Sequence, residues 1–231
     1  MNSEKISRAD VVGAKVVRQA ILSRNHSLWG NEFSVVCTDP GEPPESVYCA
    51  ALRHLNPRRT SAPAAASHTF LRIGQSALMS DDTLNQLTQT AQRLEKHRQH
   101  FTLSIDNPLD ALPGPVERRA MVRQLYKLKD QSGIKLAYNN YKLDTNPGDL
   151  LIDLKLYDYI KMPFPDSALR LSLNTRSGLF DRLYERMLEL INTTRVCFIA
   201  DHVEFCDSAL LARNLPFEYF QGGYYSPADR L

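Results

Sequence analysis

Histidine and cysteine, the residues that most often hold a transition metal or act as nucleophiles, are few and scattered in this sequence. There are six histidines, and the four cysteines form no C-x-x-C pair. His97 and His100 are three residues apart without a third ligand in sight, so we interpret them as part of a solvated helix face. Neither a G-x-G-x-x-G fingerprint nor a G-K-[ST] phosphate loop is present. The sequence therefore predicts neither a zinc site nor a nucleotide-phosphate loop of these kinds.

Acidic, amide and lysine side chains instead occur in four short segments of the second half. These segments are LAYNNY (136–141), YIKMP (159–163), IADHVE (199–204) and QGGYYSP (221–227). In this order and spacing they resemble the EAL domain family, the cyclic di-GMP phosphodiesterases, whose members typically carry D-D-F-G, K-I-D, A-E-G-V-E and Q-G. The resemblance extends from about Gln19 to Pro227. It implies a modified (β/α)8 barrel with its site at the carboxyl ends of the strands.

The family resemblance also implies a chemistry, the metal-assisted hydrolysis of a phosphodiester. Two divalent cations polarise the phosphate and activate a water, and such hard ions need carboxylates that converge from several strand ends. Five positions match the family: the metal-binding glutamate of the name motif, the lysine that orients the water, the general base (shortened to aspartate), the second glutamate of A-E-G-V-E and the glutamine. They are Glu32, Lys161, Asp201, Glu204 and Gln221. The alternative is a structural role, in which Lys161, Glu204 and Gln221 form a neutralised pair and its hydrogen-bonding neighbour.

Most other ligand positions are substituted. By resemblance, the lost amide and carboxylate ligands fall on Gly74, Ser104, Asn139, Asn140 and Pro163. Asparagine keeps a neutral carbonyl but cannot serve as a base, and Asp106 could replace the carboxylate lost at Ser104 only through a register shift. Val36 stands where an arginine would hold a phosphate of the ligand, and Lys142 brings a bulky cation toward the site. We expect a vestigial pocket with no catalytic residue, no metal and no other cofactor.

Strands and helices alternate along the chain and must position these residues. Seven apolar or β-branched runs predict buried strands; they are Glu32–Cys37, Thr69–Ile73, Phe101–Ile105, Ile134–Tyr138, Tyr159–Met162, Val196–Ala200 and Phe217–Phe220. An eighth candidate, Gln19–Ser23, could equally end an N-terminal helix. Strand-helix alternation implies parallel strands covered by helices, and seven or eight repeats favour a closed (β/α)8 TIM-like barrel over an open sheet.

Four helices are predicted between the strands. One follows Ser80 as N-cap and runs to His97; its inner face is expected to hold Leu84, Leu87, Ala91 and Leu94. Another begins at Pro115, with Val116, Ala120, Leu125 and Leu128 inward. The longest is Leu179–Ile191, with Leu179, Leu183, Met187, Leu188 and Ile191 inward, and a short one covers Asp207–Arg213.

The domain organisation predicted is a single EAL-like domain over residues 1–231. Residues 1–18 are expected to form an N-terminal extension or helix, and the final family helix is expected to be shortened or absent. The Pro-rich stretch Thr38–Glu45 and the low-complexity stretch Thr60–Ser67 are interpreted as loops, because neither separates halves of different composition.

Composition and charge exclude further classes. The 231 residues carry 28 basic and 26 acidic side chains, a formal charge of +2, without the basic excess expected of a nucleic-acid binder. There is no apolar run of 18 residues to span a membrane and no apolar core of a signal peptide near the N-terminus, so we expect a cytoplasmic protein.

The function expected is therefore non-enzymatic. Stand-alone degenerate EAL-like proteins of enteric bacteria bind FlhD of the flagellar FlhD–FlhC activator, block its action on DNA and repress motility. The resemblance predicts the same role here, with FlhD as partner. The alternatives are a receptor that binds cyclic di-GMP without cleaving it and, as the weakest, residual phosphodiesterase activity. The interface residues are not defined by the sequence; aromatic candidates are Trp29, Tyr48, Tyr184, Tyr224 and Tyr225.

Overall fold

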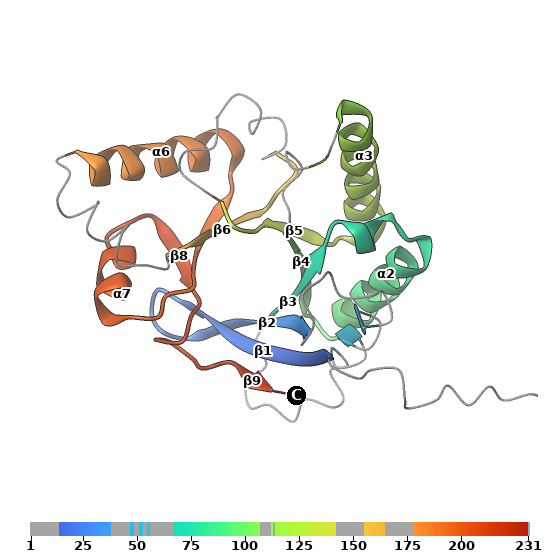
Figure 1. Cartoon of the computed structure of the whole chain (residues 1–231), viewed down its shortest axis with the longest axis horizontal. Coiled ribbons are helices and arrows are strands. Elements are labelled where there is room, and N and C mark those ends of the chain that lie inside the picture. The colour runs from blue at the N-terminus through green and yellow to red at the C-terminus, as the bar shows by residue number, and fades with distance from the viewer. Residues whose placement is uncertain are drawn as a thin grey trace, which may run out of the picture.

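The structure is a computed structural model that describes residues 14–37, 47–48, 51–52, 55, 67–106, 112, 114–141, 155–164 and 178–230. Within these ranges, eight strands close into a barrel with helices on its outside, as Figure 1 shows from one end. This confirms the predicted α/β class and the modified (β/α)8 architecture. The two interpreted loops (apart from Ser67) and Lys142 lie outside the described residues.

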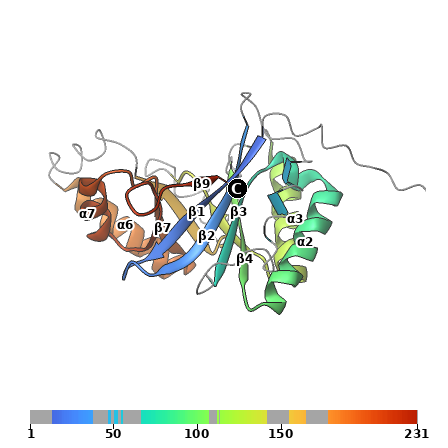
Figure 2. The ribbon, with the colours of Figure 1, turned by 90° about the horizontal axis from the view of Figure 1, so that it is seen from below.

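Nine strands and the helices follow one another in the order β1 (Ala14–Ser23), β2 (Leu28–Cys37), β3 (His68–Gly74), η1 (Ser76–Met79), α2 (Asp81–Lys96), β4 (His100–Asp106), α3 (Pro115–Ser132), β5 (Lys135–Tyr138), β6 (Tyr159–Pro163), α6 (Leu179–Thr194), β7 (Cys197–Asp201), α7 (Cys206–Arg213), β8 (Phe217–Phe220) and β9 (Asp229–Arg230). The seven strands expected from apolar runs are all present, with ends that differ by a few residues at most. Figure 2 shows α2 and α3 on one side of the barrel and α6 and α7 on the other.

The first strand departs from the parallel arrangement. Strands β2 to β8 are parallel, whereas β1 pairs antiparallel with β2 and, at the other edge, with β8. A tight turn after Ser23 makes this possible, because His26 adopts a left-handed conformation (φ 59°) and its N–H donates to the Ser23 carbonyl. The prediction for residues 1–18 is thus wrong for residues 14–18, which belong to β1 rather than to an extension or helix.

The barrel closes through a short seam between β8 and β1. Only Leu22↔Phe220 and Ser23↔Tyr219 pair across it. The other half of the same β1 edge pairs with β9, where Arg18 and Asp229 also form an ion pair of 2.8 Å. The last described strand therefore extends the seam.

Helices α2 and α3 follow their predicted signals at the ends. The Ser80 hydroxyl caps α2 by accepting from the Thr83 N–H at 3.4 Å, and Pro115 opens α3 as its first residue. Helix α3 ends at Gly133 in the left-handed conformation (φ 64°), which glycine adopts without a side-chain clash.

Three predicted inner positions are wrong. In α3 the face toward the barrel is Met121, Leu125 and Leu128, so Val116 and Ala120 lie outside, Val116 with 71% of its surface exposed. In α6 the buried residues are Leu183, Met187 and Leu190, and Leu188 is 37% exposed. The i, i+4, i+7 spacing of the actual buried sets decides the face.

Two apolar clusters stabilise the fold. The larger lies between the outer face of the barrel and the helices and includes Phe33, Leu71, Leu103, Phe198 and Leu87. The smaller fills the barrel interior: Ile21, Phe70, Ala137, Tyr159 and Ile199, with Trp29 and Tyr219 packed against it. Because successive residues of a strand point to opposite faces, strands β1, β3, β5, β6 and β7 contribute buried residues to both clusters. Of the helices that the structure describes, none has the length and apolarity needed to cross a membrane.

Candidate functional site

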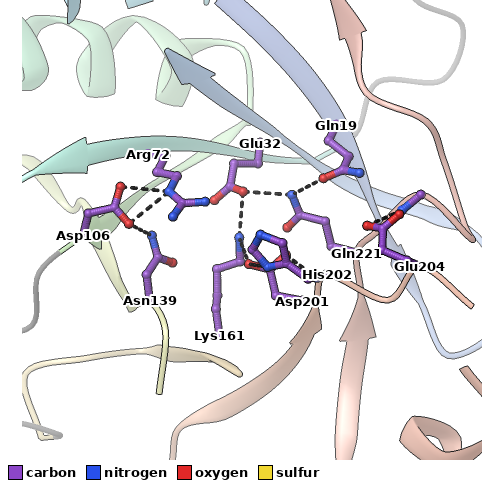
Figure 3. Close-up of polar contacts among 11 residues, drawn as sticks. Gln19, Glu32, Arg72, Asp106, Asn139, Lys161, Asp201, His202, Glu204 and Gln221 are labelled. Atoms are coloured by element: carbon purple, nitrogen blue, oxygen red, sulfur yellow. Dashed lines mark hydrogen bonds and ion pairs between the residues drawn. The ribbon is translucent and has the colours of Figure 1, made fainter. Parts of the chain in front are cut away.

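Four of the predicted site residues come together inside the carboxyl end of the barrel. Glu32 lies on β2, Lys161 on β6, Asp201 at the end of β7 and Gln221 directly after β8. All four side chains are nearly or fully buried. Figure 3 shows them pointing toward one another from different strands. The barrel thus joins residues that are up to 189 positions apart in the chain.

The Lys161 ammonium is the centre of this group. Its Nζ donates to Glu32 Oε2 at 2.7 Å and lies 3.3 Å from Asp201 Oδ2. Burial alone would lower the pKa of Lys161, but the carboxylates of Asp201 and Glu32 outweigh this effect and raise it. Burial likewise opposes the ionisation of Asp201, while Lys161 and His202 hold the pKa of this carboxyl well below its usual range. The lysine therefore stays charged as the internal counterion of two carboxylates.

Gln221 extends the network to the first strand. Its Nε2 donates to Glu32 Oε2 at 2.8 Å and to Gln19 Oε1 at 3.1 Å. Gln19 lies on β1 and donates in turn to the Ser226 carbonyl at 3.2 Å. Gln19 was not predicted as a site residue. Because the sequence left the first strand undecided between strand and helix, no pattern predicted that the Gln19 side chain points inward.

A second ion pair lies beside the first. Arg72 on β3 donates from Nε to both carboxylate oxygens of Asp106, at 3.0 and 2.8 Å, and Asn139 Nδ2 donates to Asp106 Oδ1 at 3.3 Å. Burial opposes the charge of Arg72, yet the hydrogen bonds to Asp106 raise its pKa further, with Glu32 and Asp201 contributing. Sequence reasoning missed Arg72; its signal was a single charged residue within an apolar strand, two residues before Gly74. Asp106 does reach the site, at the end of β4 and as a partner of Arg72.

Glu204 lies apart from the other four, contrary to the expectation that it pairs with Lys161. His202 has a left-handed backbone (φ 55°), which turns the chain after Asp201, and the exposed Glu204 carboxylate accepts from the Gly223 N–H at 3.1 Å. Figure 3 shows this contact away from Lys161. The partner of Lys161 is Glu32 instead.

The glycine pair after Gln221 fixes this corner. A Cβ on Gly222 (φ 148°) would overlap the backbone of Val203, and one on Gly223 would overlap the Glu204 carboxylate. The Val203 N–H donates to the Gln221 carbonyl at 3.0 Å, and the Tyr224 N–H donates to Val203 at 3.0 Å. IADHVE and QGGYYSP are therefore joined by backbone contacts as well as by Glu204.

The substituted positions lie around the same end of the barrel. Ser104 and Asn139 are buried; Gly74 donates its N–H to the Tyr48 hydroxyl at 3.1 Å; Pro163 pairs with Asp201 across β6 and β7. Asn140 follows β5 with an exposed side chain and a left-handed backbone (φ 57°). Among the aromatic candidates, Tyr48 is buried and Trp29 is packed in the barrel, while Tyr184 and Tyr224 are 40% and 46% exposed.

The described residues do not fit two divalent cations. The carboxylates of Glu32 and Asp201 already share Lys161, and that of Asp106 is bound by Arg72. At the matched and substituted site positions, four buried atoms lack a hydrogen-bonding partner among the described residues: Glu32 Oε1, Ser104 Oγ, Asn139 Oδ1 and Gln221 Oε1. Three of these four are neutral, whereas two divalent cations side by side need carboxylates that are not already paired with a lysine or an arginine. Within the described ranges, no cluster of three histidine, cysteine or acidic residues is arranged to hold a metal.

No protein-family model matches the sequence, and no curated protein is significantly similar to it. Solved structures do match. The EAL domain of Xanthomonas citri FimX in complex with cyclic di-GMP aligns with a TM-score of 0.70 and 14% identity, over 95% of this chain and 89% of that one.

Two further EAL structures give similar values. Bacillus subtilis YkuI, with cyclic di-GMP and calcium, has a TM-score of 0.69 and 21% identity, over 95% of this chain and 56% of the longer YkuI chain. The EAL domain of Mycobacterium smegmatis DcpA has a TM-score of 0.66 and 15% identity, over 93% of this chain and 92% of that one. At these identities the comparison shows the fold, and the fold is that of EAL domains.

Proposed function

We propose that this chain is an EAL-like protein that does not hydrolyse cyclic di-GMP and instead regulates by contact with a protein partner. The observation that carries the proposal is the shortage of free carboxylates: Glu32 and Asp201, which converge at the mouth, lie 2.7 and 3.3 Å from Lys161 Nζ. A divalent cation would have to compete with this ammonium for both carboxylates. Ser104, Asn139 and Pro163 supply no charge to compensate.

The partner that the family resemblance favours is FlhD. Stand-alone EAL-like proteins with a similarly substituted ligand set bind it, so we propose repression of flagellar gene expression and motility, in the cytoplasm, by blocking DNA binding of the FlhD–FlhC activator. Purified chain and FlhD, mixed and separated by size exclusion, should co-elute. Independent elution at micromolar concentrations would reject FlhD while leaving the non-enzymatic proposal intact.

A second function, a non-hydrolysing receptor for cyclic di-GMP, is favoured by one observation: FimX and YkuI hold this ligand in structures of the same fold. Two features oppose it. Arg72 is engaged by Asp106, and Val36, 53% exposed, offers no charge where the resemblance implies a phosphate-binding arginine.

One experiment separates the three functions. Isothermal titration of the purified chain with cyclic di-GMP and Mg²⁺ should give no heat, and a hydrolysis assay on the same sample should give no product. Micromolar binding without product would establish the receptor. Turnover would overturn the proposal.

Restoration of the aspartate pair provides a sharper test of the ligand map. Asn139→Asp with Asn140→Asp should remain inactive, because Lys161 still occupies the carboxylates and Ser104 and Pro163 still lack theirs. Mg²⁺-dependent hydrolysis by this double variant would show that the remaining residues suffice.

A pocket variant tests whether regulation depends on the site. The triple variant Glu32→Gln, Lys161→Met, Asp201→Asn removes the three buried charges of the pocket and keeps similar side-chain volumes. No member of this group is then left as a buried charge without its counterion. Repression of motility should persist in this triple variant. Loss of repression with an unchanged melting temperature would identify the barrel mouth as the working surface.

A further inference from the structure

The outer face of α3 is more basic than any other described helix surface. Arg119, Arg123 and Lys127 recur every four residues, are all exposed and make no ion pair within the described part of the chain. Positions i, i+4 and i+8 lie on one side of a helix, so the three cations form a row about 12 Å long. By contrast, Lys129 on the inner flank is bound by Asp158 at 2.8 Å.

Apolar side chains are interspersed with this row. Val116 is 71% exposed and Tyr126 is 43% exposed, on the same outer side of α3 as the cations. The helix carries both the sequence-expected inner residue Val116 and a large aromatic ring outward, which a purely solvated helix face does not require. Such mixed basic and apolar surfaces bury apolar area and pair charges when a complementary helix docks.

A cleft runs along the row between α3 and α2. It has a volume of about 270 Å³. Its lining is mostly polar, with one carboxylate (Asp81), one ammonium (Lys127) and amides such as Asn85 and Gln124, together with Leu84 and Leu128. Leucines supply an apolar floor, and the amides can bond to polar groups at its rim. Lys127 belongs to both the row and the cleft, so the two form one continuous surface. Figure 1 shows α2 and α3 side by side on the outside of the barrel.

We propose that this surface, the α3 row with the α2–α3 cleft, is a docking site for an acidic amphipathic helix of a protein partner. Carboxylates spaced four residues apart on that helix would pair with Arg119, Arg123 and Lys127, and its apolar side chains would contact Val116, Tyr126 and the cleft floor. This proposal rests on the proposed function, in which the chain acts through a protein partner. It places the contact with that partner outside the barrel mouth.

Charge complementarity favours a protein helix over nucleic acid. Three cations over about 12 Å neutralise few phosphates, and the chain has a formal charge of only +2. The exposed Asp130, one turn further along the same side, limits the acidic stripe of the partner to the length of this row. Val116 and Tyr126 have no place in a phosphate-tracking surface, whereas they suit the apolar stripe of a helix.

The test is fluorescence anisotropy with a labelled 18-residue helical peptide that carries glutamate at every fourth position beside a leucine stripe. The full chain should bind it, with affinity that falls as salt rises. Arg119→Glu, Arg123→Glu and Lys127→Glu together should weaken binding at least about tenfold. A matched control, Lys15→Glu, Arg98→Glu and Lys155→Glu, changes the net charge equally at exposed sites elsewhere and should bind as the unaltered chain does.

Hydrogen exchange locates the contact. Bound peptide should protect amides in 81–88 and 115–131. Failure of the unaltered chain to bind the peptide, equal weakening in both triple variants, or protection confined to the barrel mouth would each overturn the proposal. So would a preference for a single-stranded oligonucleotide or anionic vesicles over the peptide. Hydrolysis of cyclic di-GMP would overturn the proposed function alone, since this binding assay does not depend on it.

Discussion

The two ends of the barrel are closed by opposite kinds of interaction. At the carboxyl end, Lys161 and Glu32 form a fully buried ion pair, with Arg72 and Asp106 beside it. At the amino end, the Trp29 ring is stacked between His68 and Tyr219, with centroid distances of 4.1 and 3.6 Å. One end is held by matched charges, the other by aromatic surfaces.

The two ends should differ in how well they tolerate substitutions. A buried charge is stable only while its counterion is present, so each member of the charged end depends on the others. Stacked rings gain from contact area and lose only part of it when one ring is trimmed. A single substitution at the charged end should therefore lower the stability of the fold sharply, whereas one at the aromatic end should lower it only in part.

Removal of Lys161 should have the largest effect. Lys161→Ala removes the buried ammonium that Glu32 and Asp201 share and should lower the free energy of unfolding by about 3–5 kcal/mol. The matched change at the other end is Lys135→Ala. Because Lys135 Nζ lies 5.7 Å from the Tyr159 ring centroid, this substitution should lower the free energy of unfolding by less than about 1 kcal/mol. Urea denaturation of both variants measures the contrast, and equal losses would contradict it.

Trp29→Ala should have the next largest effect. The half-buried ring contacts His68, Phe70, Tyr159 and Tyr219, and its loss should cost about 2 kcal/mol. Trp29→Phe keeps part of the stack and should recover about half of that in the same urea titration. A phenylalanine variant no better than the alanine one would show that the amino end is as intolerant as the charged end.

The pH dependence should have opposite signs at the two ends. Burial, His100 and Lys135 lower the pKa of His68 to about 4. Since the unfolded chain takes up this proton near pH 6.5, stability should fall as the pH drops from about 6.5 to 4, by about 1 kcal/mol after screening at this partly exposed site. The hydrogen bond to Asp201 raises the pKa of His202, so its contribution is complete below pH 6.5 and is lost as the pH rises through the folded value.

Two variants separate these contributions. In melting temperatures recorded from pH 4 to 8, His68→Gln should flatten the acid side of the profile and His202→Gln the neutral side. A shift of the same side by both substitutions would rule out the assignment of the two histidines to different pH ranges.

Divalent cations should have the smallest effect. Because Lys161 and Arg72 are the counterions of the mouth, millimolar Mg²⁺ or Mn²⁺, or a chelator, should move the melting temperature by less than about 1 °C. A concentration-dependent rise would mean that cations displace Lys161. The same rise in the Lys161→Met variant, but not in the unaltered chain, would show that the lysine excludes them.

The fold was largely predictable because the residue types of its strands differ from those of the segments around them. Seven runs of β-branched and aromatic residues mark β2 to β8, and Ser80 and Pro115 mark the starts of α2 and α3. Strand β1 remained undecided because Gln19, one of its inward residues, is polar and interrupts the alternation. Val116, Ala120 and Leu188 were misassigned because several apolar spacings fit a helix, and only packing against the barrel selects one.

The site was predictable in its members but not in its pairings. Glu32, Lys161, Asp201 and Gln221 do converge, as strand-end positions should. Arg72 was missed because apolar neighbours make its strand resemble pure core. Glu204 was misplaced because the left-handed backbone at His202, which turns the chain before Glu204, is not predictable from residue types.

The seam between β8 and β1 has a consequence for synthesis. Leu22 and Ser23 pair with Phe220 and Tyr219, so the barrel cannot close until residues 219 and 220 have left the ribosome. Until then the hairpin of β1 and β2 has an unpaired edge, and such contacts between distant segments form slowly. Closure of the barrel therefore has to wait for synthesis of β8, and the interval before it is the stage at which we expect chaperones to be most useful.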